Sequence, residues 1–122
     1  METVQVKDKT FSIFLTEEQI QKRVKEVAAQ ISSDLKGKNP VFLSVLNGSF
    51  IFAADLVRNV DMPCEISFIR MSSYQGTSST GQVTQVLGLK ESIKGRVVVI
   101  VEDIVDSGLT MQSLLKLLRE GV

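Results

Sequence analysis

Two short, almost uninterrupted apolar runs set the strongest limit on how this chain folds. They are "VFLSVL", residues 41–46, and "VVVIV", residues 97–101. Runs of this length without polar alternation are typical of strands that are covered on both faces, as in a parallel sheet. Each run is followed by a polar turn and then by apolar residues at helical spacing. We therefore predict an α/β fold with a mainly parallel, twisted sheet flanked by helices.

The rest of the chain predicts the other elements of this fold. A helix is expected to open at Thr16, which can form a capping box with Gln19, and its apolar face continues to Leu35. The preceding "FSIFL" is typical of a short strand or an extended lead-in. The other expected elements are a helix at 50–60, strands at 64–70 and 83–89, a strand at 96–101 that is the most buried of all, and a final helix from Ser107.

A polar segment separates two of the expected strands, from Met71 to Gln82. It reads "MSSYQGTSSTGQ" and shows no periodicity, so we predict a loop. Long loops are uncommon in compact domains unless they are functional. With Gly76 and Gly81 as flexible points, the segment is a candidate lid, and the alternative is a hairpin end without function.

The final helix is expected to present an apolar face, and the sequence stops directly after it. That face would be formed by Met111, Leu114, Leu115 and Leu118. A parallel sheet usually continues from such a helix into another strand. We therefore expect that the chain is a fragment or that a partner completes it.

Charge and composition exclude several classes of protein. Lys plus Arg and Asp plus Glu both number 14, which argues against a main role in binding nucleic acid or a membrane surface. The sequence has no His and one Cys, Cys64, which excludes Ser–His triads, Cys–His pairs and an internal disulfide, and argues against zinc. Cys64 is interpreted as a small core residue. The polar N-terminus predicts no signal peptide, and the lack of a long apolar run predicts no membrane span. The expected location is therefore the cytoplasm.

Two acids, Glu102 and Asp103, come directly after the second apolar run. In open α/β sheets, ligands bind at the carboxyl ends of strands. Neighbouring strand residues point to opposite faces, so we expect these acids to lie on either side of a ligand. Carboxylates only accept hydrogen bonds, which suits sugar hydroxyls or a hard ion such as Mg²⁺.

An anion site is predicted at the start of the last helix. The segment Asp106 to Thr110 offers free backbone N–H groups, the helix dipole and two hydroxyls, and Gly108 allows close approach. The alternative is that Asp106 or Ser107 merely caps the helix. That alternative does not explain the two acids ending a buried strand, whereas a sugar phosphate satisfies both features.

A second anion site, or else a plain tight turn, is predicted at "LNGSF", Leu46 to Phe50. It too combines a strand end, a glycine and a helix start. Two such sites would suit a ligand with phosphate at one end and pyrophosphate at the other. The sequence contains neither G-x-G-x-x-G nor G-x-x-x-x-G-K-[ST].

These segments resemble the motifs of a known family. "VVVIVEDIVDSGLTMQSLLKLL" resembles the phosphoribosyl-pyrophosphate motif of type I phosphoribosyltransferases. "FLSVLNGSFIFAADLVR" and "FIRMSSYQGTSSTGQV" resemble the pyrophosphate loop and the flexible loop of the hypoxanthine (hypoxanthine-guanine) phosphoribosyltransferases. The resemblance runs from about Phe11 to the end. It implies the type I phosphoribosyltransferase fold, with residues 1–122 as the N-terminal two-thirds of the family's core domain.

The resemblance implies a purine-salvage enzyme that uses Mg²⁺. Such an enzyme transfers phosphoribose from phosphoribosyl pyrophosphate to N9 of hypoxanthine or guanine, giving IMP or GMP and pyrophosphate. Glu102 and Asp103 would hold the ribose hydroxyls, directly or through magnesium, and Asp106 would face N7 of the purine as general acid/base. The 5′-phosphate would be cradled by Asp106, Ser107, Gly108, Leu109 and Thr110. Relatives form homodimers and homotetramers, and neither a nucleic acid nor a membrane is an expected partner.

The other two motifs imply roles at the pyrophosphate end. Leu46, Asn47 and Gly48 would bind pyrophosphate, and in the family the bond before position 47 is often a non-proline cis peptide. Ser73 and Tyr74 would belong to the lid that closes over the reacting centre. Orientation, neutralisation of pyrophosphate by metal and exclusion of water would then accelerate the reaction.

The chain departs from the family pattern in three respects. Position 47 is Asn and position 109 is Leu, where many or some members have Lys, so each removes a positive charge near a phosphate. The family also continues past the last helix with strands and a hood that complete the base pocket. We therefore expect the 122-residue chain alone to be inactive or nearly so.

Two other classes remain as alternatives. One is a regulatory module of the same fold that binds phosphoribosyl pyrophosphate without catalysis, which the neutral charge does not favour. The other is a phosphate-accepting receiver domain, which needs a suitably placed lysine late in the chain. Lys90, Lys94 and Lys116 are unsuitably placed.

Overall fold

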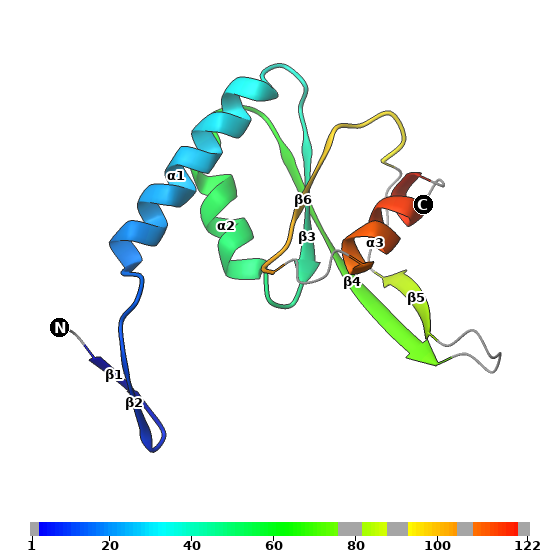
Figure 1. The fold of residues 1–122 in the computed structure, drawn as a ribbon. Coiled ribbons are helices and arrows are strands. Elements are labelled where there is room, and N and C mark those ends of the chain that lie inside the picture. Colours follow the sequence, from blue (N-terminus) through cyan, green and yellow to red (C-terminus); the bar gives the residue numbers. More distant parts are fainter. Residues whose placement is uncertain (1–2, 76–81, 88–92, 105–108, 120–122) are drawn as a thin grey trace.

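A four-stranded sheet with helices on both faces forms the body of the molecule (Figure 1). The computed structural model describes residues 3–75, 82–87, 93–104 and 109–119. The elements, in order, are β1 (Thr3–Val6), β2 (Lys9–Ser12), α1 (Glu17–Asp34), β3 (Val41–Leu46), α2 (Phe50–Asn59), β4 (Glu65–Gln75), β5 (Gln82–Leu87), β6 (Val98–Val101) and α3 (Leu109–Arg119). The sheet order is β5-β4-β3-β6, with β3 parallel to both β4 and β6 and with β4 antiparallel to β5. The expected mainly parallel sheet with flanking helices is confirmed.

Alternate residues of β3 pack into two hydrophobic cores, one on each face of the sheet. Phe42 packs with buried residues of α1 and α2, whereas Leu43 and Val45 pack with Leu114 of α3 and with Ile69. Because these side chains are apolar and β3 is the central strand, both faces of β3 are covered. Figure 1 shows α1 and α2 on one side of the sheet and α3 on the other.

The central strand is β3, and the expectation that the 96–101 strand is the most buried is wrong. All residues of β3 except Leu46 are buried, whereas in β6 only Val101 is buried. The reason is position, because β3 has a neighbour on each side while β6 has a described neighbour on one side only. Composition alone does not reveal which of two apolar strands is central.

Helix α1 begins as the sequence predicts. Thr16 Oγ1 accepts from the backbone N–H of Gln19 at 3.1 Å, and the backbone N–H of Thr16 donates to Gln19 Oε1 at 2.8 Å, which completes the capping box. Leu35 caps the other end, and Gly37 then adopts a φ of +80° that favours glycine.

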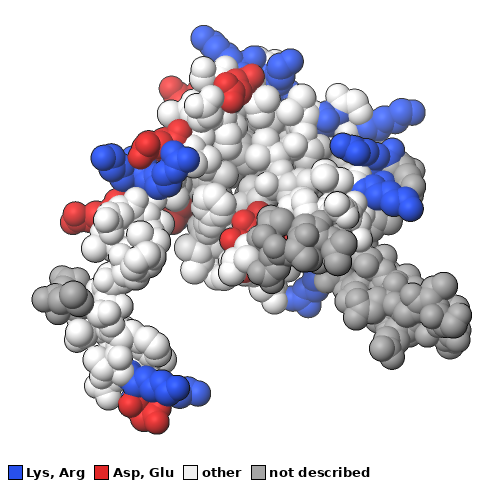
Figure 2. Space-filling view, viewed as in Figure 1, with Lys and Arg blue, Asp and Glu red and all other residues white. Residues whose placement is uncertain are grey.

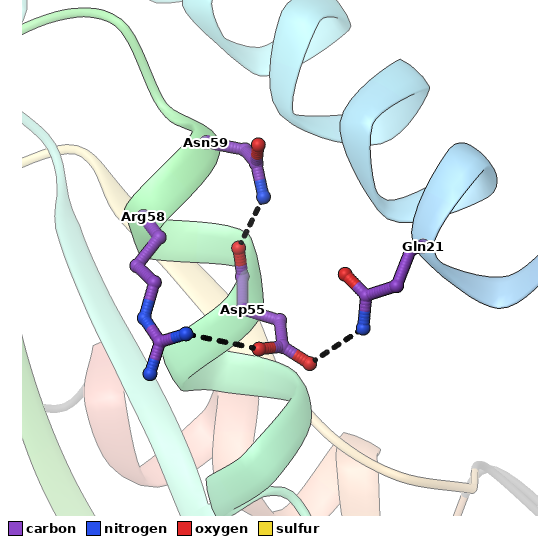
Figure 3. A network of polar contacts seen from close by, with 4 residues as sticks. All are labelled: Gln21, Asp55, Arg58 and Asn59. Atoms are coloured by element: carbon purple, nitrogen blue, oxygen red, sulfur yellow. Dashed lines mark hydrogen bonds and ion pairs between the residues drawn. The ribbon is translucent and has the colours of Figure 1, made fainter. Parts of the chain in front are cut away.

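A polar network ties α1 to α2 (Figure 3). Gln21 Nε2 donates to Asp55 Oδ2 at 3.0 Å across the two helices, while Arg58 lies 3.9 Å from the other carboxylate oxygen of Asp55. Asn59 donates to the backbone oxygen of Asp55 at 2.8 Å. The bond from Gln21 to Asp55 therefore links the two helices directly.

Two segments differ from the sequence expectation. Residues 71–75 and Gln82, expected in a loop, belong to β4 and β5, because the polar residues after Arg70 continue in an antiparallel ladder. Residues 3–12 form a β1–β2 hairpin that the sequence did not reveal, and it extends away from the body (Figure 1). All of its residues are exposed, so no buried face marks it in the sequence.

No helix in the described ranges has the length and apolarity that a membrane span requires. Cys64 packs against the core beside α1 and α2, and burial raises the pKa of its thiol. The packing of Cys64 agrees with its interpretation as a small core residue.

Candidate functional site

The loop after β3 turns sharply into α2. The peptide bond between Leu46 and Asn47 is cis, as the family resemblance implies. Residues 47–49 form the turn, and the backbone N–H of Phe50 donates to Asn47 O at 3.3 Å. The loop therefore delivers Asn47 and Gly48, both exposed, at the carboxyl end of the central strand.

Two buried hydroxyls hold this loop from below. Ser49 Oγ donates to the backbone oxygen of Val45 at 2.5 Å, and the hydroxyls of Ser44 and Ser49 lie 2.8 Å apart. Since the Ser49 proton is used by Val45, Ser44 is the donor of the second bond. Both serines are fully buried, so this chain of bonds anchors the loop to the strand it leaves. Sequence reasoning missed Ser44 and Ser49, although two serines flanking an apolar strand end were a usable signal.

The two acids after β6 sit beside this loop. Val101, the last residue of β6, pairs with Ser44 of β3, so the chain reaches the same edge of the sheet. Glu102 Oε1 accepts from the backbone N–H of Asp103 at 3.0 Å, and Asp103 Oδ1 accepts from the N–H of Ile104 at 2.8 Å. These bonds fix the orientation of both carboxylates.

Gly48 and Asp103 are in direct contact. A Cβ placed on Gly48 would overlap Asp103 Oδ2 and lie 2.8 Å from Asp103 Cγ. Only a residue without a side chain allows this approach. The contact joins the loop after β3 to the acids after β6, so two motifs that are separated by more than fifty residues form one site. Figure 2 shows acidic atoms at the centre of this face, where the two segments meet in Figure 1.

The two carboxyls titrate differently. Burial and hydrogen bonding to Asp103 raise the pKa of Glu102, whereas the bonds from Glu102 and from the N–H of Ile104 lower the pKa of Asp103. Asp103 is exposed and Glu102 is half-buried. Because β6 ends at Val101, the alternation of strand side chains does not by itself place the two acids. That they lie on either side of a ligand stays a prediction.

A cation from the next strand also reaches the loop. Arg70 of β4 donates to Asn47 Oδ1 at 2.8 Å. It stands in register with Leu46, the last residue of β3. Sequence reasoning missed Arg70, because strand register places it there and one strand's sequence does not state its register.

The remaining expected site residues are only partly placed. The backbones of Ser73 and Tyr74 lie on β4, where they pair with Thr84 and Val83 of β5. Leu109 and Thr110 are the first residues of α3. Asp106, Ser107 and Gly108 lie outside the described residues.

The donor set at this edge fits a hard divalent cation. Glu102 and Asp103 supply carboxylate oxygens, and Mg²⁺ is typically bound by few protein carboxylates together with substrate phosphates. Within the described ranges no group of three or more His, Cys, Asp or Glu side chains could hold a metal by itself.

Comparison with known proteins identifies the fold. The phosphoribosyl transferase domain family matches residues 12–121. The chain is 44% identical over 107 residues to the hypoxanthine-guanine-xanthine phosphoribosyltransferase of Tritrichomonas foetus, and 41% identical over 108 residues to the hypoxanthine-guanine phosphoribosyltransferase of Bacillus subtilis. These matches cover 88% of this chain but 58% and 60% of the two relatives.

Solved structures agree with the sequence relatives. A hypoxanthine phosphoribosyltransferase from Staphylococcus aureus superposes with a TM-score of 0.79 at 40% identity, over 89% of this chain and 60% of that one. A hypoxanthine-guanine phosphoribosyltransferase from Bacillus anthracis gives 0.76 at 41% identity, over 88% and 61%. The chain thus spans about 60% of the length of these relatives. From residue 12 to residue 121, this chain belongs to the phosphoribosyl transferase domain family.

Proposed function

We propose that the chain is the donor-binding part of a purine-salvage phosphoribosyltransferase. In the proposed reaction, phosphoribose passes from phosphoribosyl pyrophosphate to N9 of hypoxanthine or guanine, with release of pyrophosphate. The observation that carries the proposal is the contact between Gly48 and Asp103, which joins a candidate pyrophosphate loop to a pair of ribose-binding acids. The names of the relatives, all hypoxanthine-type phosphoribosyltransferases, support the choice of substrates.

Each residue has a defined part in this proposal. Glu102 and Asp103 accept hydrogen bonds from the ribose hydroxyls and offer oxygens to Mg²⁺, which when bound would neutralise the pyrophosphate. Asn47 and Gly48 present the loop to the pyrophosphate. Asp106 holds or releases a proton at N7 of the purine.

The lid and the phosphate cradle complete the proposed site. Ser73 and Tyr74 close over the reacting centre and exclude water, because hydrolysis would destroy the donor. The 5′-phosphate binds at the N-terminus of α3, where Leu109 and Thr110 begin the helix and the helix dipole favours an anion.

The proposal extends to the setting of the protein. We place residues 1–122 in one core domain, the N-terminal two-thirds of the family's domain, in a cytoplasmic homodimer or homotetramer. Ile66 and Phe68, each about two-fifths exposed on the α2 side of β4, support a protein partner. The named relatives are enzymes, which favours a transferase over a regulatory module of the same fold.

The test separates binding from turnover. Isothermal titration of the 122-residue chain with phosphoribosyl pyrophosphate and Mg²⁺ should give saturable heat. A coupled assay with hypoxanthine should give little or no turnover, because this chain spans about 60% of the length of the relatives. A chain that does not bind the donor would contradict the proposal.

A further inference from the structure

Arg70 reaches the loop after β3 from the neighbouring strand. It stands opposite Leu46 in the parallel register, and its guanidinium donates to Asn47 Oδ1 at 2.8 Å. The loop residues Leu46 to Ser49 carry no charged side chain of their own. Arg70 of β4 therefore brings a positive charge to this loop, and strand register fixes its position.

The Arg70 guanidinium bonds to the residue next to the one that contacts the acids. Arg70 bonds to Asn47, and the next residue, Gly48, lies against the carboxylate of Asp103. A diphosphate bound here adds negative charge beside Glu102 and Asp103, and like charges at short range repel. A fixed cation at this position would offset that repulsion.

The bond also determines which way the Asn47 amide faces. A guanidinium carries only donors, whereas an amide carries one acceptor oxygen and one NH₂ donor group. Asn47 must therefore turn Oδ1 toward Arg70, and its Nδ2 donor faces away from the guanidinium. Rotation of the amide would set donor against donor. Arg70 thus turns a neutral side chain into an oriented donor, and the bond uses one of its five N–H groups.

We propose that Arg70 is a positioning residue for the diphosphate group of the donor, orienting the Asn47 amide toward it and supplying the cation that offsets Glu102 and Asp103. The proposal rests on the proposed function and adds a residue that acts on one end of the ligand. Arg70 is exposed, so its replacement removes the charge and the bond without opening the core.

The experiment compares three ligands by isothermal titration of the 122-residue chain in Mg²⁺. They are phosphoribosyl pyrophosphate, inorganic pyrophosphate and ribose 5-phosphate, of which the last lacks the diphosphate. The variants are Arg70→Gln, Arg70→Lys and Asn47→Ala, with the double variant of Arg70→Gln and Asn47→Ala. The matched control is Arg58→Gln, which removes an exposed arginine from the last turn of α2, at the end of the helix away from the loop.

Arg70→Gln should weaken binding of both diphosphate-containing ligands by about 10- to 150-fold, the range of a charge-assisted hydrogen bond. Ribose 5-phosphate should bind as it does to the unmodified chain, and so should all ligands with Arg58→Gln. Arg70→Lys should fall between, since it keeps the charge but not the planar fork. The double variant should lose less than the sum of the single losses, because the two side chains act as one unit.

Equal binding of pyrophosphate by Arg70→Gln and the unmodified chain would overturn this inference and leave the proposed function standing. An equal loss of affinity for ribose 5-phosphate would also overturn it, because Arg70 would then act on any anionic ligand and not on the diphosphate group. An unmodified chain that binds none of the three ligands would overturn the proposed function and this inference together.

Discussion

Replacement of Gly48 by Ala tests the contact on which the site depends. The added Cβ would lie 2.8 Å from Asp103 Cγ and would overlap Oδ2. Carbon atoms pack best at about 3.5–4.0 Å, so the Asp103 carboxylate must move by about 1 Å. Gly48 does not have a positive φ, so alanine suits the backbone.

The variant should therefore bind poorly and remain folded. Rotation of an exposed side chain off its preferred rotamer costs about 0.5–1.5 kcal/mol, and Gly→Ala returns about 0.4–1 kcal/mol by stiffening the unfolded chain. The free energy of unfolding should change by less than about 1 kcal/mol. Loss of a charged hydrogen bond costs about 1.5–3 kcal/mol, so the affinity for phosphoribosyl pyrophosphate with Mg²⁺ should fall about 10- to 150-fold.

Gly95→Ala is the matched control because it should lower stability and leave donor affinity unchanged. Gly95 has a φ of +75°, and no atom lies within 4 Å of the position that an added Cβ would take. Alanine there is strained by about 1–2 kcal/mol but touches nothing in the site. Urea unfolding and isothermal titration on both variants give the comparison. Donor binding by Gly48→Ala at the unmodified affinity would refute the reasoning.

Three further outcomes follow from single contacts. Ser49→Ala should lower the free energy of unfolding by about 1–3 kcal/mol in urea, since it leaves the buried Ser44 hydroxyl unpaired, and adding Ser44→Ala should recover part of that loss; an unchanged midpoint would contradict the buried bonds. Donor affinity should fall with decreasing pH, with a midpoint above the usual glutamate pKa, because the pKa of Glu102 is raised and metal binding needs the carboxylate. The contribution of Glu102 to stability has the opposite sense: it is present at low pH and is lost as pH rises through the raised pKa. The Glu102→Gln variant should lack this fall in donor affinity at low pH. Thr16→Ala should cost about 1 kcal/mol in thermal unfolding by removing the capping box and should leave donor affinity unchanged; a loss of affinity would mean that α1 acts on the site.

Local patterns in the sequence predict the elements well where one signal dominates. The capping box of Thr16 and Gln19 sets the start of α1, and the apolar run before Leu46 defines β3. The hairpin at residues 3–12 was missed because it buries no side chain. Polar residues after Arg70 continue β4 because pairing with β5, and not burial, holds them in the sheet.

The site divides along the same line. The place of Glu102 and Asp103 at the carboxyl end of β6 could be predicted from sequence, because acids at the end of an apolar strand are a local signal. Their mutual arrangement could not, because it depends on where β6 ends. The bond from Arg70 to Asn47 depends on strand register, and register arises only when strands pair.

The central claim is that the loop after β3 and the acids after β6 form one donor site. Amide NMR of the chain with added phosphoribosyl pyrophosphate and Mg²⁺ tests it most directly. Signals of residues 46–49 and of residues 102–104 should shift together with the same saturation curve, while those of residues 3–12 should stay fixed. Shifts at only one of the two segments, or at neither, would contradict the claim.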